Sequence, residues 1–278
     1  MVERLNQHLV ATAADGSSHT TTSAAIDAAR HSRARINPDP VDSSRVHKIQ
    51  SVALLEPAVL DLFRNDTIVA SARRALAKMG LRKRAADRDN NDDDDDASST
   101  SNTMEPLDVF GTKYFPMQPG GTSVSWHQDS HYFGSGGFEA KCLSCAIYLE
   151  ATSRANGCFR IIPGSHLPTW DCGNDITRSA DGLLPHEAGK GRWAHGDWIQ
   201  GSIPQEQAID LEVPAGTVVL FDPRVVHAAH ANESSTTRAS VFGHLVLRSE
   251  TFVYKKNNID FTFGKYADRH EIASACHY

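Results

Sequence analysis

From residue 107 onward the chain is built of short apolar stretches separated by turns that contain proline and glycine. Leu107–Gln118 is rich in β-branched and aromatic residues and is closed by Pro119, Gly120 and Gly121. Further strands are predicted at Cys142–Glu150, Cys158–Ile162, Leu211–Val213, Thr217–Asp222 and Ala239–Arg248. Short strands at irregular spacing, with turn residues between them, predict a β-sandwich or barrel.

The first 80 residues have a different pattern of apolar residues, which predicts helices. In Glu56–Arg64 and Asp66–Met79, apolar residues recur every three to four positions. Asn65 or Asp66 can cap the second helix, and Gly80 is expected to end it. A further short helix is predicted near Ser23–His31. A length of 278 residues favours one domain, in which helices flank a mainly β core.

Two segments interrupt the expected domain, and a third follows it. Residues 81–105 contain an unbroken acidic run at Asp92–Asp96, whose like charges repel and bury nothing, so we expect a disordered loop. Calcium binding is disfavoured because the glycine turn and the spaced ligands of a calcium loop are missing. Residues 166–209 show no clear period and predict a lid-like insertion in the β core of residues 106–248. Residues 249–278 are expected to form a C-terminal tail.

Charge and hydropathy exclude several kinds of partner. Residues 81–105 hold four basic and eight acidic side chains and so contribute −4 of the net charge of −6. The remainder is nearly neutral and has no basic stripe, so nucleic acid is not an expected partner. No apolar run approaches the roughly 20 residues that span a bilayer, and the first residues lack a secretory apolar segment. We therefore expect a cytoplasmic protein with no membrane contact; the sequence carries no signal for an oligomeric state.

The five cysteines indicate reduced thiols rather than a disulfide framework, because their number is odd and their spacing irregular. Cys142 and Cys145 form a Cys-x-x-Cys motif, which can support redox chemistry or zinc binding. They lie inside a predicted strand with no second pair nearby, so this interpretation is the weaker one.

Two His-x-Asp pairs are candidates for metal binding. With 14 histidines in 278 residues, about one such pair is expected by chance. The pair His195 and Asp197 lies in the predicted insertion with no strand before it, which is typical of a polar turn. The pair His127 and Asp129 follows a strand, and two-residue spacing on extended backbone puts both side chains on one face.

A third ligand and a cation follow one hundred residues later. The predicted strand Thr217–Asp222 leads through a short turn to His227, and Arg238 begins the next strand. Two histidines and one carboxylate are the ligand set of the facial triad that holds non-haem Fe(II). An arginine nearby can bind the carboxylate of a co-substrate as a two-pronged ion pair. On the residues alone, the alternative is a set of unrelated polar side chains.

Over residues 107 to 248 the chain resembles the phytanoyl-CoA dioxygenase family of Fe(II)/2-oxoglutarate oxygenases. Five stretches carry the resemblance, and their order and spacing together are more specific than any one of them. They are Lys113 placed 14 residues before His127, then Trp126–Phe133, Ala155–His166 and Ala215–Phe221, and finally His227 with Asn232 and Arg238 at fixed steps.

The resemblance implies a double-stranded β-helix core, also called a jelly roll or cupin-like fold. It implies that His127, Asp129 and His227 bind Fe(II), and that Arg238 binds the distal carboxylate of 2-oxoglutarate, with O2 as the second co-substrate. His227 is preferred over His230 because the arginine of the family lies eleven residues beyond its ligand histidine.

The chain departs from the family pattern at two positions of the co-substrate pocket. Ala229 stands where many members have a serine whose hydroxyl contacts 2-oxoglutarate, and Cys145 stands near the position of a pocket tryptophan. The carboxylate ligand Asp129 is present, which disfavours halogenation. Candidates for contact with substrate or ligands, each with an ordinary structural alternative, are Lys113, Gln118, Trp126, His131 and His230.

The function implied is hydroxylation of an unactivated C–H bond in a small-molecule substrate, with release of succinate and CO2. Two alternatives stay open: a jelly-roll protein that binds metal or ligand without turnover, and a cupin-like metalloenzyme that does not use 2-oxoglutarate. The substrate class (acyl-CoA, amino-acid derivative or natural product) is not readable from the sequence.

Overall fold

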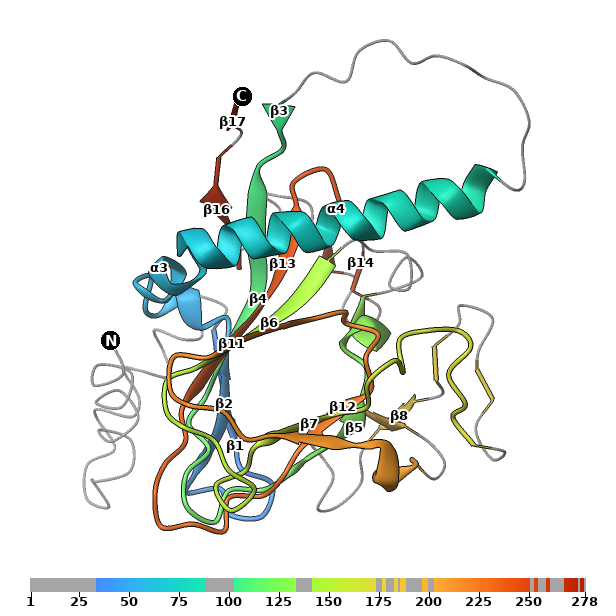
Figure 1. Ribbon diagram of the computed structural model, residues 1–278. Helices are drawn as coiled ribbons and strands as arrows, with labels where there is room; N and C mark the ends of the chain where they lie inside the picture. The colour runs from blue at the N-terminus through green and yellow to red at the C-terminus, as the bar shows by residue number, and fades with distance from the viewer. Residues whose placement is uncertain are drawn as a thin grey trace.

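Two antiparallel sheets face each other in the computed structural model of the protein (Figure 1). The larger sheet has the strand order β1-β2-β4-β13-β6-β11, and β16 also pairs with β4; the smaller sheet has the order β10-β7-β12-β5. This arrangement confirms the predicted mainly β, double-stranded β-helix fold. The structure describes residues 34–88, 103–133, 142–173, 177–178, 183–184, 186–188, 197–199, 203–250, 253–254, 259–260, 268–274 and 276–277.

Each of the six predicted stretches overlaps a strand, and the ends differ by a few residues: these strands are β4, β6, β7, β10, β11 and β13. Strands β1 and β2 were not predicted and lie in the N-terminal part that was expected to be helical. The larger sheet comprises β1 (Arg35–Pro38), β2 (Val46–Gln50), β4 (Leu107–Phe115), β6 (Cys142–Tyr148), β11 (Val218–Phe221), β13 (Ser240–Leu247) and β16 (Arg269–Ala273). The smaller sheet comprises β5 (Val124–His127), β7 (Phe159–Ile161), β10 (Ile209–Leu211) and β12 (His227–Ala229). Three further two-stranded pairs are β3 (Thr103–Met104) with β17 (Cys276–His277), β8 (His186–Ala188) with β9 (Asp197–Ile199), and β14 (Val253–Tyr254) with β15 (Ile259–Asp260).

Strand β6 shows how the larger sheet is covered on both faces. Leu143, Cys145 and Ile147 are buried in one apolar cluster with side chains of the two helices. The alternate residues Ala146 and Tyr148 belong to another cluster, with aromatic side chains of β7 and β11. Because side chains on a strand alternate between faces, β6 separates a helix-facing core from the interior between the sheets.

The helix-facing core is closed by α3 (Val59–Phe63) and α4 (Asp66–Arg88), and α4 crosses the outer face of the larger sheet (Figure 1). Gly80 does not end α4, contrary to the sequence-based prediction. A glycine inside a helix costs about 1 kcal/mol relative to alanine, and the leucine, arginine, lysine and alanine residues that follow are good helix formers. The first eight residues of the predicted loop 81–105 are therefore helical. Residues 89–102 and the helix expected near Ser23–His31 lie outside the described residues.

The segment expected to be a C-terminal tail contributes a strand to the larger sheet. β16 pairs with β4 between Leu107 and Phe110. The side chains of Asp108 and Arg269 are fully buried and form an ion pair of 3.1 Å, and Arg248 donates to the other oxygen of Asp108 at 2.7 Å. This charge-assisted network explains why β16 stays attached to the edge of β4.

The predicted insertion, residues 166–209, packs against the outer face of the smaller sheet where the structure describes it. Leu184, Ile199 and Ile203 are buried there in a cluster with Ile162 and Val226. Among the helices of the described residues, none is long and apolar enough to span a lipid bilayer.

Candidate active site

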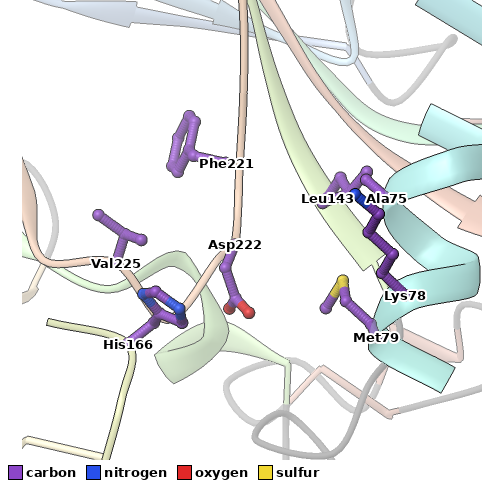
Figure 2. A pocket seen from close by; sticks show the side chains of 8 residues that line it. All are labelled: Ala75, Lys78, Met79, Leu143, His166, Phe221, Asp222 and Val225. Carbon is purple, nitrogen blue, oxygen red and sulfur yellow. The ribbon is translucent and has the colours of Figure 1, made fainter. Parts of the chain in front are cut away.

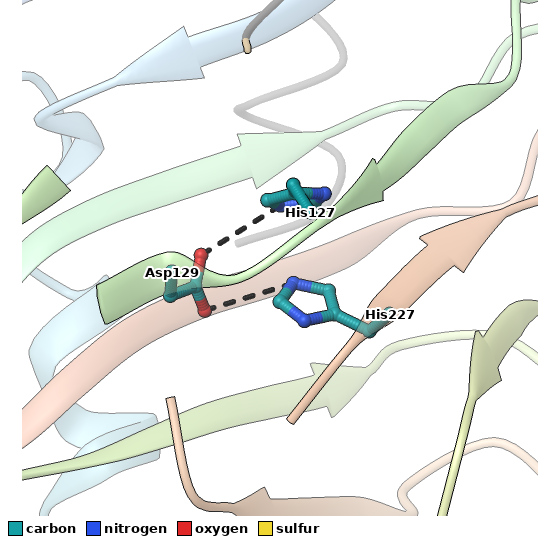
Figure 3. Close-up of side chains that lie close together, drawn as sticks. All are labelled: His127, Asp129 and His227. Atoms are coloured by element: carbon teal, nitrogen blue, oxygen red, sulfur yellow. Dashed lines mark ion pairs between the residues drawn. The ribbon is translucent and has the colours of Figure 1, made fainter. Parts of the chain in front are cut away.

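The two candidate histidines lie directly opposite each other on neighbouring strands. His127 ends β5, and His227 begins β12, its antiparallel partner in the smaller sheet. Asp129 begins the 3₁₀ turn η2 (Asp129–Tyr132) that follows β5, so it is not on extended backbone as predicted. The turn nevertheless brings its carboxylate to both imidazoles, and one ligand atom from each side chain lies within 4.8 Å of the others (Figure 3).

The two imidazoles are oriented for metal binding through Nε2. Their Nε2 atoms each lie 3.8 Å from a different oxygen of Asp129. Each Nδ1 lies 2.8 Å from a backbone carbonyl oxygen, that of Ser125 for His127 and that of Val225 for His227. A carbonyl can only accept, so Nδ1 carries the proton and Nε2 presents its lone pair to the centre. Two neutral imidazoles and a carboxylate on one side of a point form a donor set that fits Fe(II).

The charges around the centre keep Asp129 ionised. Burial by itself would raise the pKa of this carboxyl, but His227 and then Lys113 oppose it, and the net result is a pKa well below its usual range. Burial lowers the pKa of His227. An ionised carboxylate and an unprotonated imidazole are the forms that bind a metal.

Asp129 is supported by residues that the sequence analysis did not single out. Ser144 on β6 donates to its Oδ2 at 2.6 Å, and the Oγ of Ser144 lies 3.2 Å from Nδ1 of His244 on β13. The other ring nitrogen of His244 lies 3.4 Å from Nζ of Lys113. Strand alternation is the only sequence signal for Ser144, and it required knowledge of which face of β6 points inward. Lys113 is partly buried, and its ammonium group lies next to His244 behind the ligand set.

Arg238 is a buried cation with capacity to bind an anion. Its side chain is 3% exposed and donates to Oγ of Ser240 at 2.8 Å and to the carbonyl oxygen of Gly157. Within the described residues, Nε has no hydrogen-bond partner and no carboxylate forms a salt bridge with the side chain. Burial lowers the pKa of Arg238. A buried guanidinium with an unused donor fits the carboxylate of a co-substrate, which would compensate the buried charge.

Of the two positions at which the chain departs from the family pattern, Ala229 lies near the candidate site and Cys145 does not. Ala229 follows His227 by two residues on β12, on the same face, opposite Phe159. Cys145 lies on the helix-facing side of β6, so the assignment of Cys145 to the co-substrate pocket is wrong. Cys142 is three residues away on the same strand and so faces the other way, which excludes a Cys-x-x-Cys site.

Two candidates for substrate contact have structural roles away from the ligand set. Trp126 precedes His127 on β5 and therefore faces outward, where it packs under the insertion and against the guanidinium of Arg160 at 5.1 Å. The side-chain oxygen of Gln118 accepts the backbone N–H of Val46 at 2.9 Å, which fixes the start of β2. Neither residue supports a substrate role in this structure.

His131 and His230 are also outside the ligand set. His131 lies in η2 with its ring against Tyr132, at a centroid distance of 5.2 Å. Nε2 of His230 lies 3.0 Å from Asp210, and Cys158 completes a second group of three ligand types within 4.8 Å. Asp210 is already paired with Arg160 at 2.7 Å, so its charge is balanced without a metal. The second His-x-Asp pair cannot be placed, because His195 lies outside the described residues.

A cavity of about 340 Å³ lies between α4 and the turn that follows β11 (Figure 2). Two of its lining residues also contact His227: the Phe221 ring packs on the imidazole at a centroid distance of 5.1 Å, and the Val225 carbonyl oxygen lies 2.8 Å from its Nδ1. The cavity is lined by Ala75, Lys78, Met79, Leu143, His166, Phe221, Asp222 and Val225.

Comparison with solved structures shows the same fold. The crystal structure of EctD from S. alaskensis with 2-oxoglutarate and 5-hydroxyectoine superposes with a TM-score of 0.53 at 16% identity, over 90% of this chain and 69% of that chain. The epimerase SnoN in complex with Fe3+, alpha ketoglutarate and nogalamycin RO gives a TM-score of 0.50 at 14% identity, over 91% and 87% of the two chains.

Sequence comparison adds curated relatives. An ectoine dioxygenase from Bordetella parapertussis is 29% identical over 132 residues, which are 45% of this chain and 42% of the relative. A probable phytanoyl-CoA dioxygenase from Caenorhabditis elegans is 30% identical over 125 residues, 42% of this chain and 34% of the relative. The matched segment thus spans less than half the length of either relative. The family profile described as Phytanoyl-CoA dioxygenase (PhyH) matches residues 12–240, so the chain belongs to the phytanoyl-CoA dioxygenase family of Fe(II)/2-oxoglutarate-dependent dioxygenases.

Proposed function

We propose that this protein is an Fe(II)/2-oxoglutarate-dependent dioxygenase that hydroxylates a C–H bond of a small molecule and releases succinate and CO2. The proposal rests on two features that occur on the same side of the smaller sheet, a set of metal ligands and a buried cation. His127, Asp129 and His227 converge with both Nε2 lone pairs directed at one point, and Arg238 is a buried cation with an unused donor.

Each of these residues has a defined task in the proposed reaction. His127, Asp129 and His227 would hold iron, and three protein ligands would leave coordination positions open for co-substrates. Arg238 binds the distal carboxylate of 2-oxoglutarate and so fixes the orientation of the keto acid. The bound iron supplies the oxidising chemistry, in which O2 is activated as 2-oxoglutarate is decarboxylated.

The surroundings of the site bury two of the three ligands and restrict the movement of His227. The His227 ring is packed between Phe159 and Phe221, each at a centroid distance of 5.1 Å. Asp129 is 6% exposed and His227 is 3% exposed. A largely buried ligand set held by packing favours oxidation of a bound substrate over loss of the oxidising equivalents to solvent.

The test is succinate formation by protein loaded with Fe(II) under air, in the presence of candidate substrates from three classes: acyl-CoA thioesters, amino-acid derivatives and natural-product scaffolds. We expect substrate-stimulated succinate release that Arg238→Ala abolishes at low 2-oxoglutarate concentration. The absence of both turnover and any 2-oxoglutarate-dependent change in the iron absorption spectrum would support a non-catalytic binding protein. Succinate release that Arg238→Ala leaves unchanged would refute Arg238 as the ligand of the distal carboxylate. Substrate oxidation without succinate release would support a metalloenzyme that does not use 2-oxoglutarate.

A further inference from the structure

We propose that Tyr148 is a second ligand for the distal carboxylate of 2-oxoglutarate and donates its phenolic hydroxyl beside Arg238. The inference rests on the proposed function and adds a residue to its co-substrate site. The hydroxyl of Tyr148 is buried and has no hydrogen-bond partner within the described residues. Buried tyrosine hydroxyls almost always have a partner, so an unpartnered one marks a place where a ligand or a water is missing.

Tyr148 and Arg238 border the same space. Tyr148 ends β6 on its inward face and lies directly opposite Ser240, whose hydroxyl accepts from Arg238. The guanidinium carbon of Arg238 lies 5.8 Å from the centre of the Tyr148 ring. Two buried donors, the Nε of Arg238 and the hydroxyl of Tyr148, therefore lack partners in one corner of the barrel. Two donors from neighbouring side chains can each serve one oxygen of a carboxylate.

The protonation state of Tyr148 suits this role. Burial raises the pKa of the phenol well above its ordinary value, and Arg238 opposes that rise without cancelling it. The hydroxyl therefore keeps its proton at neutral pH and acts as a donor. A neutral donor beside a buried guanidinium adds to the binding of an anion without a second charge to desolvate.

This assignment accounts for the departure at Ala229. The resemblance places a serine hydroxyl at that position, and alanine has none. Ala229 lies opposite Phe159, and Gly157, two residues before Phe159, accepts a hydrogen bond from Arg238. The corner that the serine would serve is thus the corner of Arg238 and Tyr148, where the phenol supplies the hydroxyl from the opposite sheet.

The experiment compares two keto acids that differ only at the distal end. Fe(II)-loaded protein is titrated without oxygen with 2-oxoglutarate and with 2-oxopentanoate, which lacks the distal carboxylate, and binding is followed by calorimetry and by the absorption of the iron–keto-acid chelate. We expect Tyr148→Phe to weaken 2-oxoglutarate binding about tenfold or more, as for loss of a hydrogen bond to a charged group. Binding of 2-oxopentanoate should be unchanged.

Tyr114→Phe is the matched control, because Tyr114 is equally buried but lies in the helix-facing core. Ala229→Ser in the Tyr148→Phe background is expected to recover part of the lost affinity. Equal affinity of wild type and Tyr148→Phe for 2-oxoglutarate, or an equal loss for both keto acids, would overturn the role of Tyr148. A wild-type protein with no 2-oxoglutarate-dependent signal would overturn the proposed function itself and the inference with it.

Discussion

Ser144 donates a hydrogen bond of 2.6 Å to Oδ2 of Asp129, and so links the middle of the larger sheet to the carboxylate of the candidate iron site. The direction of this bond follows from the hydrogen bonds that link Ser144 to His244 and His244 to Lys113. The Lys113 ammonium can only donate, so Nε2 of His244 accepts and Nδ1 of His244 carries the proton. Nδ1 then donates to Ser144, whose own proton goes to Asp129. One carboxylate oxygen is thereby occupied, and Oδ1 is left for the metal.

Removal of this hydrogen bond should weaken metal binding without unfolding the protein. Loss of a group that orients a metal ligand costs about 10- to 100-fold in metal affinity, and we expect Ser144→Ala to fall in this range. Titration of the apoprotein with Fe(II) without oxygen measures the effect. Thr152→Ala is the control, because Thr152 is a buried hydroxyl bonded to backbone groups of Leu211 and Val213. Equal affinities for Ser144→Ala and Thr152→Ala would contradict the role of Ser144.

The ligand set predicts that substitutions of two nearby histidines, His227 and His230, have different effects on iron binding. His227→Ala should strongly lower the Fe(II) content, because it removes one of three protein ligands, and His127→Ala and Asp129→Ala should do the same. His230→Ala should bind Fe(II) as wild type does, because His230 is paired with Asp210 outside the ligand set. The measurement is the iron content of each variant after gel filtration. Retention of iron by His227→Ala would show that another residue completes the site.

Arg238 should govern the affinity for 2-oxoglutarate rather than the affinity for iron. Loss of a buried charged partner costs about 2–5 kcal/mol, so Arg238→Ala should raise KM for 2-oxoglutarate by about 30-fold or more. Arg238→Lys keeps the charge but loses the planar guanidinium, so its KM for 2-oxoglutarate should lie between those of wild type and Arg238→Ala. Iron content and thermal stability serve as controls in the same preparations. An unchanged KM in both variants would remove Arg238 from the site.

Acid should destabilise the apoprotein through its buried histidines. Burial and then Lys113 lower the pKa of His244 from 6.5 to about 3, and burial also lowers that of His227. Between these values the unfolded chain binds protons that the folded protein does not, so the stabilisation is complete above about pH 6.5 and declines as the pH falls toward 3. Asp129, whose pKa is lowered, loses its contribution only in stronger acid.

Urea unfolding of the metal-free protein at about pH 7.5 and about pH 5 tests this dependence. His244→Phe should show a smaller difference between the two conditions than wild type, because phenylalanine takes up no proton in the unfolded state. Phenylalanine keeps an aromatic ring at this position, where the His244 ring packs against Phe110 and Phe133 at centroid distances of 5.1 and 5.0 Å. The same difference in variant and wild type would show that His244 does not contribute.

The family, the β fold and the positions of the six predicted strands were readable from the sequence, because turn residues and strand-forming stretches act locally. Strands β1, β2 and β16 were not, because their place in the sheet depends on pairing with distant partners. The step of eleven residues from His227 to Arg238 is also a local property, because one short connection joins β12 to β13. The predicted end of α4 at Gly80 was wrong, because the prediction did not consider the good helix formers that follow this glycine. Trp126 and Cys145 were placed at the site although each lies on the opposite face of its strand.

Sequence spacing by itself determined which residues could be ligands, and tertiary structure alone decided what surrounds them. Side chains on a strand alternate between two faces, so a shift of one residue exchanges all inward and outward positions. The register of β4, β13 and β6 brings together Lys113, His244 and Ser144, which form a series of hydrogen bonds that ends at Asp129. The same register sets Tyr148 opposite Ser240 and beside Arg238. These partners are far apart in the sequence, and no local pattern records that they meet.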